Sequence, residues 1–83
     1  MSTIEQLKIL LKTQLQLGNA VDRFDARTEL FGSLPEFDSM AVVSIVTAIE
    51  DQFGVEIQDD ELTADVFATL GSLAEFVDLK VGG

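Results

Sequence analysis

A proline-containing loop that leads into a helical apolar stripe constrains the fold of this chain most. Pro35 has no backbone N–H to donate, so we expect the residues before Asp38 to approach as a loop. After it, apolar side chains recur with the spacing of one helix face at Val42, Ile45, Val46, Ile49 and Phe53. Gly54 then provides a stop signal. The pattern predicts an amphipathic helix over residues 39–53.

Asp38 and Ser39 stand at the start of this predicted helix. The carboxylate of Asp38 suits an N-cap, because it can accept hydrogen bonds from the free N–H groups of the first turn. Ser39 then occupies the first helical position. A phosphate attached to its hydroxyl would be stabilised by the positive end of the helix. Ser39 is therefore the strongest candidate for a functional residue.

A second helical stripe covers residues 3–17. Its members are Ile4, Leu7, Leu11 and Leu15, with Ser2 or Thr3 as the cap and Gly18-Asn19 as the stop. The connection over residues 18–37 is long for a compact domain, and such loops usually carry function. We expect apolar anchors to hold it to the helix ends, namely Phe24, Leu30, Phe31, Leu34 and Phe37.

The C-terminal part of the chain predicts two more helices. Asp59 or Asp60 can cap a short helix that includes Leu62, Val66 and Phe67. Thr69 and Ser72 offer caps for a last helix whose inner residues are Leu70, Leu73, Phe76, Val77 and either Leu79 or Val81. No stretch of the sequence alternates with period two for long enough to predict a sheet. We expect one all-α domain over residues 1–83, a small four-helix bundle of three longer helices and one short helix, with a long loop between helices one and two.

The residue composition argues against catalysis. The chain has no cysteine and no histidine, so it lacks thiolate ligands and the commonest general base. A nucleophilic serine would have only carboxylates or lysines to activate it. The acidic run Asp59-Asp60-Glu61 with Asp65 lacks the alternating ligands and central glycine of an EF-hand loop, so it is read as helix-capping, while weak divalent-cation binding stays open. We expect a protein that is not an enzyme and has no dedicated metal site.

The charge balance favours basic partners. The chain has 5 basic and 15 acidic residues, a net charge of −10. Such a surface repels nucleic acid and anionic membranes and speeds encounter with Lys/Arg patches. The sequence lacks a run long enough to span a membrane and the residue order of a signal peptide. The expected location is the cytoplasm.

A second face of the helix over residues 39–53 begins at Ser39. At helical spacing it continues through Met40, Val43, Thr47, Glu50 and Asp51. Apolar side chains exposed beside carboxylates suggest a surface for protein docking. The alternative is that Met40 and Val43 cover the anchors of the preceding loop.

Several segments, taken in order along the chain, resemble the acyl carrier proteins. Phe37-Asp38-Ser39-Met40 resembles the Asp-Ser-Leu signature of that family, with Met40 in place of leucine. Residues 50–57 are similar to the segment that closes the second helix of these proteins. Residues 69–73, followed by Phe76 and Val77, resemble the entry to the last helix.

The resemblance implies a monomeric four-helix carrier whose serine bears a covalent 4′-phosphopantetheine arm. By this correspondence Ser39 is the attachment point and Asp38 its neighbour in the motif. The arm would supply the thiol that the chain lacks and hold acyl intermediates as thioesters. The implied partners are a phosphopantetheinyl transferase and acyl-transferring or acyl-modifying enzymes with basic docking patches. The implied processes are fatty-acid, polyketide or related biosynthesis.

Two features separate this chain from common subtypes of the family. Fatty-acid carriers tend to have an acidic residue where Ser44 stands, so the acidic face is thinner here. The residues before Ser39 also lack the Gly-Gly pattern of peptidyl carriers. The segment over residues 34–43 instead resembles the free-standing carriers associated with bacterial exosortase and exopolysaccharide gene clusters.

Two functional hypotheses follow from the sequence. In the first, the chain is a carrier, and its core near Val46, Ile57, Leu62 and Phe67 opens to shelter an acyl chain. In the second, the chain is an acidic helical module for protein–protein interaction that is never modified. Covalent modification of Ser39 separates the two hypotheses.

Overall fold

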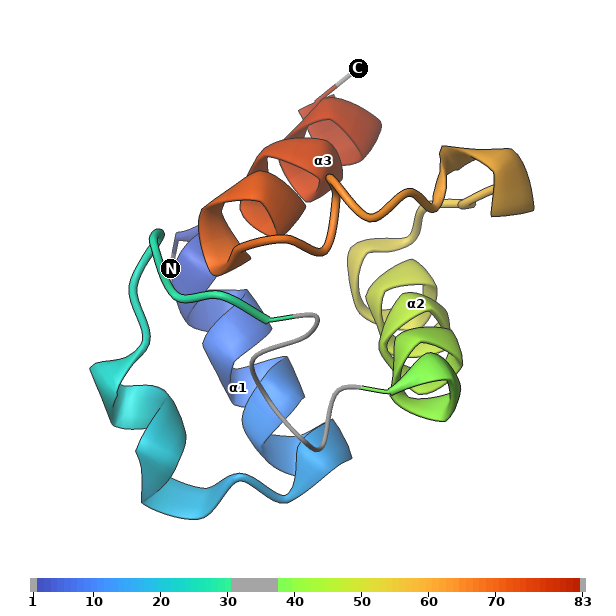
Figure 1. Ribbon diagram of the computed structural model, residues 1–83. Helices are drawn as coiled ribbons and strands as arrows, with labels where there is room; N and C mark the ends of the chain where they lie inside the picture. Colours follow the sequence, from blue (N-terminus) through green and yellow to red (C-terminus); the bar gives the residue numbers. More distant parts are fainter. Residues whose placement is uncertain (1, 31–37, 83) are drawn as a thin grey trace.

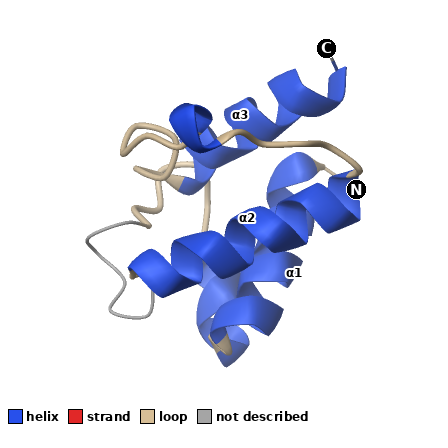
Figure 2. Cartoon of the chain, turned by 90° about the vertical axis from the view of Figure 1, so that its right-hand side faces the viewer, coloured by secondary structure: helices blue, strands red, loops and turns tan. Residues whose placement is uncertain are grey.

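The computed structural model describes residues 2–30 and 38–82, with the side chain of Asp59 left aside. In chain order its helices are α1 (Thr3–Leu15), the 3₁₀ helix η1 (Gly18–Arg23), α2 (Ser39–Phe53), the 3₁₀ helix η2 (Asp59–Glu61) and α3 (Leu70–Gly82). Figure 2 shows helices and loops without a strand in the described parts, where an isolated bridge joins Glu29 and Thr69. The predicted all-α class is confirmed.

The helix ends follow local capping chemistry. Ser2 caps α1, since its Oγ accepts a hydrogen bond from the Glu5 N–H (3.2 Å). The prediction placed the end of this helix too late: α1 ends at Leu15, and Gln16 already has a left-handed backbone with φ of 54°. Gly18 therefore begins η1, which the sequence did not predict, instead of stopping α1.

The core forms where α1, α2 and α3 meet. The most deeply buried side chains come from these helices and from the connection, and they are Leu7, Leu11, Leu30, Ile45, Ile49, Leu70, Leu73 and Val77. On α2 the predicted inner stripe is buried at its centre and half-buried at Val42 and Phe53. Figure 1 shows α2 on one side of α1, with the connection that contains η1 on the other side.

The connection between α1 and α2 is held against the entry to α3. The Leu30 N–H donates to the Ala68 carbonyl (3.1 Å), and the Leu70 N–H donates to the Thr28 carbonyl (2.8 Å). Of the predicted anchors, Leu30 is buried and Phe24 is half-buried. The other three, Phe31, Leu34 and Phe37, lie outside the described residues.

A glycine permits the closest approach of this connection to α3. The Gly71 N–H donates to the Ala26 carbonyl at 2.9 Å. A Cβ atom at position 71 would lie 2.7 Å from that carbonyl oxygen, which is closer than non-bonded atoms approach. Glycine is therefore required at this contact.

The predicted short helix before α3 is wrong in extent. The 3₁₀ helix η2 ends at Glu61, Leu62 follows it in an irregular stretch, and Val66 and Phe67 lie in turns. The segment forms a turn in which the Val66 N–H donates to the Thr63 carbonyl (3.1 Å), and the Ser72 hydroxyl of α3 lies 2.9 Å from the Val66 carbonyl.

The last helix confirms its predicted caps but not all its predicted inner residues. Ser72 Oγ accepts from the Thr69 N–H, and Thr69 Oγ1 accepts from the Ser72 N–H, both at 3.0 Å. Leu79 and Val81, one of which was expected inside, are 72% and 54% exposed. Leu79 lies on the side of α3 opposite the buried Val77, about 200° away around the helix axis, while Val81 is in the last turn, which extends away from α1 and α2 (Figure 1).

Candidate functional site

Ser39 is the exposed first residue of α2. Asp38 precedes it with an extended backbone, and its Oδ1 accepts a hydrogen bond from the Ala41 N–H at 2.9 Å. The Val42 N–H donates to the Asp38 carbonyl (3.0 Å) and closes the first turn. The predicted N-cap is thus confirmed. The Ser39 hydroxyl lies at the end of the helix where free N–H groups and the macrodipole favour negative charge.

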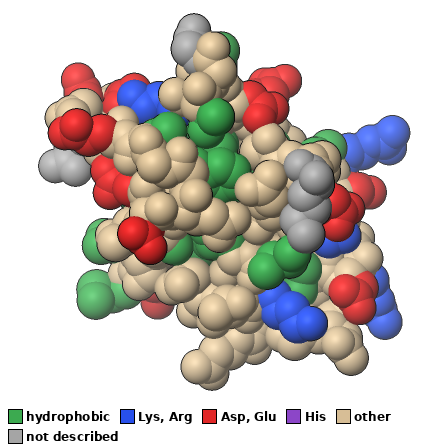
Figure 3. Space-filling model, turned by 180° about the vertical axis from the view of Figure 1, so that it is seen from behind, with side chains coloured by type: hydrophobic (Ala, Val, Ile, Leu, Met, Phe, Trp, Pro, Cys, Tyr) green, Lys and Arg blue, Asp and Glu red, His purple; other side chains and the backbone are tan. Residues whose placement is uncertain are grey.

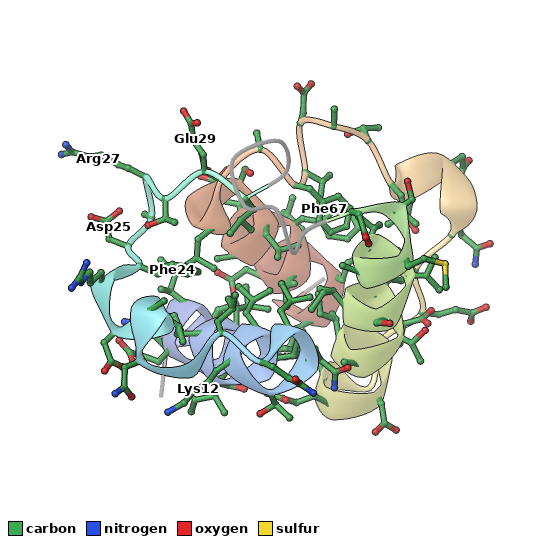
Figure 4. All side chains as sticks on the ribbon, turned by 60° about the horizontal axis from the view of Figure 1, so that its bottom comes forward. Lys12, Phe24, Asp25, Arg27, Glu29 and Phe67 are labelled. Atoms are coloured by element: carbon green, nitrogen blue, oxygen red, sulfur yellow. The ribbon has the colours of Figure 1, made fainter. Side chains whose placement is uncertain are left out.

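A cavity of about 250 Å³ lies beside Ser39. Its lining comes from the start of α2 and from the turns that follow η2, and the residues are Ser39, Val42, Leu62, Thr63, Ala64 and Phe67. Phe67 is buried, and Figure 4 shows it beside α2. The cavity is somewhat smaller than pockets that bind drug-sized ligands, which span about 300–1,000 Å³. It therefore offers a mostly apolar space for a small group next to an exposed hydroxyl.

The cavity agrees only in part with the lining expected from the sequence. Leu62 and Phe67 do line it, whereas Val46 and Ile57 are buried in the core and do not. Thr63 and Ala64 were not predicted. No local pattern could have assigned them, because what brings them to Ser39 is the path of the chain after η2.

The second face of α2 is on the surface. Met40 and Val43 are 76% and 63% exposed, and Thr47 and Asp51 are exposed as well. The Thr47 hydroxyl donates to the Val43 carbonyl (3.0 Å), a bond within the helix. The face predicted for docking is therefore exposed at Met40, Val43, Thr47 and Asp51.

Glu50, the remaining member of this face, has a structural contact. It is half-buried, and its Oε2 accepts a hydrogen bond from the Ile57 N–H at 2.9 Å. Its own carbonyl accepts from the Val55 N–H (3.2 Å). Glu50 thus holds the link after α2 to the end of the helix, in addition to any contact that it makes with partners.

The exposed face of α2 also borders a groove against α1. The groove has a volume of about 630 Å³, and α1 contributes Ile9, Leu10, Thr13 and Gln14 to it. Val43, Thr47 and Asp51 line the opposite side. Ile9 is 50% exposed, in agreement with its absence from the predicted inner stripe of α1. A partner that contacts α2 here would also meet α1.

An ion pair joins η2 to α3. The Lys80 Nζ lies 2.7 Å and 2.8 Å from the two carboxylate oxygens of Glu61. This hydrogen bond, with a second one from the Gln58 N–H, holds the pKa of Glu61 below its ordinary value. The pair joins residues that are far apart in the sequence, so no sequence motif predicted it.

Figure 3 shows one face of the molecule, on which carboxylates and basic side chains surround exposed apolar side chains. Within residues 2–30 and 38–82, no group of acidic residues is arranged to hold a metal ion. Over the same residues, none of the helices has the length and apolar character needed to cross a bilayer.

Comparisons with known proteins agree with this site. A family model described as a phosphopantetheine attachment site matches residues 5–77. A structure solved by NMR in solution, the holo acyl carrier protein of Nitrosomonas europaea, is 42% identical, with a TM-score of 0.91 and 100% of both chains covered. The fold and site thus define a phosphopantetheine carrier domain, and the chain belongs to the acyl carrier protein family. It is a carrier and not an enzyme, and its covalent cofactor is 4′-phosphopantetheine.

Proposed function

We propose that Ser39 is the residue to which the arm is attached, and that the arm carries acyl intermediates of fatty-acid, polyketide or related biosynthesis. One observation carries this proposal: Ser39 presents an exposed hydroxyl at the capped start of α2, next to an apolar cavity. The 4′-phosphopantetheine arm, when attached, supplies a terminal thiol that holds acyl groups as thioesters.

The other described serines in the range matched by the family model fit an attachment site less well. The hydroxyl of Ser72 is half-buried and lies 2.9 Å from the Val66 carbonyl. Ser44 lies within α2, away from the free N–H groups of the helix start. Ser39 alone among these three combines exposure with a position where a helix stabilises a phosphate.

The cavity beside Ser39 is the proposed shelter for the acyl group. Val42, Leu62 and Phe67 give it apolar side chains from both walls. Burial of apolar surface stabilises by roughly 25 cal/mol per Å². The acyl group is carried on the thiol at the far end of the arm, so it gains this stabilisation when the arm folds back toward Ser39.

The proposed docking surface is the exposed face of α2, made of Met40, Val43, Thr47 and Asp51, with Glu50 partly engaged in the fold. Its partners are a phosphopantetheinyl transferase and acyl-transferring enzymes with basic patches, because the chain has a net charge of −10. Assignment to the exosortase-associated subtype, the monomeric state and the cytoplasmic location stay predictions from the sequence.

Intact mass spectrometry tests the attachment residue. The protein is incubated with coenzyme A and a promiscuous phosphopantetheinyl transferase, and one phosphopantetheine adduct is expected. Ser39→Ala should abolish the adduct, while the control Ser44→Ala should keep it. No adduct on the wild-type protein would favour the unmodified interaction module, and an adduct that survives Ser39→Ala would move the site elsewhere.

A further inference from the structure

One wall of the cavity beside Ser39 is a segment without regular helix. Residues 62–67 contribute Leu62, Thr63, Ala64 and Phe67 to the lining, and they lie in an irregular stretch and turns between η2 and α3. The facing wall, Ser39 and Val42, belongs to α2. A helix is stiffened by its own backbone hydrogen bonds, so the width of the cavity depends on how the wall over residues 62–67 is held.

The start of this wall is held by an ion pair. Glu61 immediately precedes Leu62, and both its carboxylate oxygens accept from Lys80 Nζ, at 2.7 Å and 2.8 Å. The two side chains are 30% and 24% exposed, so the pair is partly shielded from water. Lys80 lies in the last turn of α3, and the contact therefore fixes the wall to a helix of the core.

The end of the wall is held by a different bond. The Ser72 hydroxyl in the first turn of α3 lies 2.9 Å from the Val66 carbonyl and 2.9 Å from the Thr69 carbonyl and can donate to either, and Phe67 is buried. Between the two ties, the Val66 N–H donates to the Thr63 carbonyl (3.1 Å), a local turn that joins the segment to itself. Leu62 and Val66 are only partly buried where they pack against the core, so loss of the first tie would remove the polar restraint at the start of the wall and leave the second in place.

We propose that the Glu61–Lys80 ion pair limits how far the cavity beside Ser39 opens, and so sets the length of acyl chain that the protein retains. This inference rests on the proposed function of Ser39 and the cavity. Neither Glu61 nor Lys80 lines the cavity, so both are positioning residues that act through Leu62 and Thr63. Without the pair the wall moves away from α2, and longer chains gain apolar contact.

The effect can be measured as the protection of the thioester from chemical cleavage, which needs no acyl-transferring partner enzyme. Butyryl, octanoyl and dodecanoyl arms are transferred from the matching acyl-coenzyme A by a promiscuous transferase. Cleavage by hydroxylamine is then followed by intact mass. We expect Lys80→Met to lower the ratio of dodecanoyl to butyryl cleavage rates by about two- to five-fold, the range expected for loss of a partly exposed ion pair.

Three further variants make the test specific. Glu61→Gln should match Lys80→Met, and Lys80→Arg should keep the wild-type ratio because arginine can hold both carboxylate oxygens. Lys12→Met removes an exposed lysine of α1 and should also keep it. A purely structural role for Lys80 would change all cleavage rates by one factor and leave their ratio unaltered.

The outcomes separate this inference from the proposed function. An unchanged ratio in Lys80→Met, a failure of Lys80→Arg to restore it, or an equal effect of Lys12→Met would overturn the inference while the adduct on Ser39 still forms. A missing adduct, seen in the same mass spectra, would refute the proposed function and the inference together.

Discussion

Replacing Asp38 with alanine removes the acceptor that caps α2 at its functional end. The Asp38 Oδ1 accepts from the Ala41 N–H at 2.9 Å, and the side chain is exposed, so no cavity is created by its removal. Loss of an N-cap of this kind costs about 0.5–2 kcal/mol of stability, typically about 1 kcal/mol. For a domain of this size each kcal/mol lowers Tm by about 4–8 °C. Thermal unfolding followed by far-ultraviolet circular dichroism should show this loss.

Asp38→Asn separates the cap from the charge. Asparagine caps about as well as aspartate, so this variant should keep most of the stability. Asp38→Asn also loses the charge beside the helix dipole, an effect that salt screens, so both variants are compared at high salt. Equal losses in the two variants at high salt, where the effect of the charge is screened, would contradict the acceptor as the source of the stability. No loss in Asp38→Ala would refute the cap as a source of stability.

Three further perturbations follow from the structure. Ile49 is 1% exposed, so Ile49→Ala should lower the free energy of unfolding, measured in urea, by about 2–5 kcal/mol. Val43→Ala, on the outer face of the same helix, should change it by less than about 0.5 kcal/mol. Similar losses in the two variants would contradict the assignment of Ile49 to the core. Asp51→Lys should lower the rate of modification by the transferase, and more so at low salt, where exposed charges are screened less. The control Glu75→Lys, on α3, should lower this rate less. Equal rates in the two variants would show that only the net charge of the protein matters. The lowered pKa of Glu61 means that its ion pair stabilises the fold above the ordinary value of 4.5 and that this stability is lost as pH falls through the lower folded value. The difference in Tm between wild type and Glu61→Gln should therefore shrink in acid, and a difference independent of pH would contradict this.

Local features of the fold were predictable from the sequence. The bounds of α2, its cap and its stop at Gly54 were predicted as they are found. The same holds for the reciprocal caps of Thr69 and Ser72. Each of these depends on atoms no more than a few residues apart, so propensity and spacing decide them. The end of α1 was missed because Gln16 takes a left-handed conformation that its residue type does not favour.

The extent of the short helix was not predictable, because long-range contacts decide it. Leu62, Val66 and Phe67 have a spacing that suits a helix, yet Leu62 lies in an irregular stretch and Val66 and Phe67 lie in turns, with the Val66 carbonyl 2.9 Å from the Ser72 hydroxyl of α3. Glu50 is a similar case. Its place on the outer face of α2 follows from helical spacing, but the Ile57 N–H that its carboxylate accepts lies beyond the end of the helix.

The sequence by itself determined where the exposed serine lies and what chemistry surrounds it along the chain. Ser39 follows a good capping residue and opens a helix, and the chain has neither cysteine nor histidine, so a covalent group must supply any thiol. Only the tertiary structure decided what lies across from that serine. The wall that begins at Leu62 faces α2 across the cavity, and Glu61, the residue before it, is paired with Lys80 at the far end of α3. Such a contact joins distant parts of the chain, and its geometry exists only once the helices have packed.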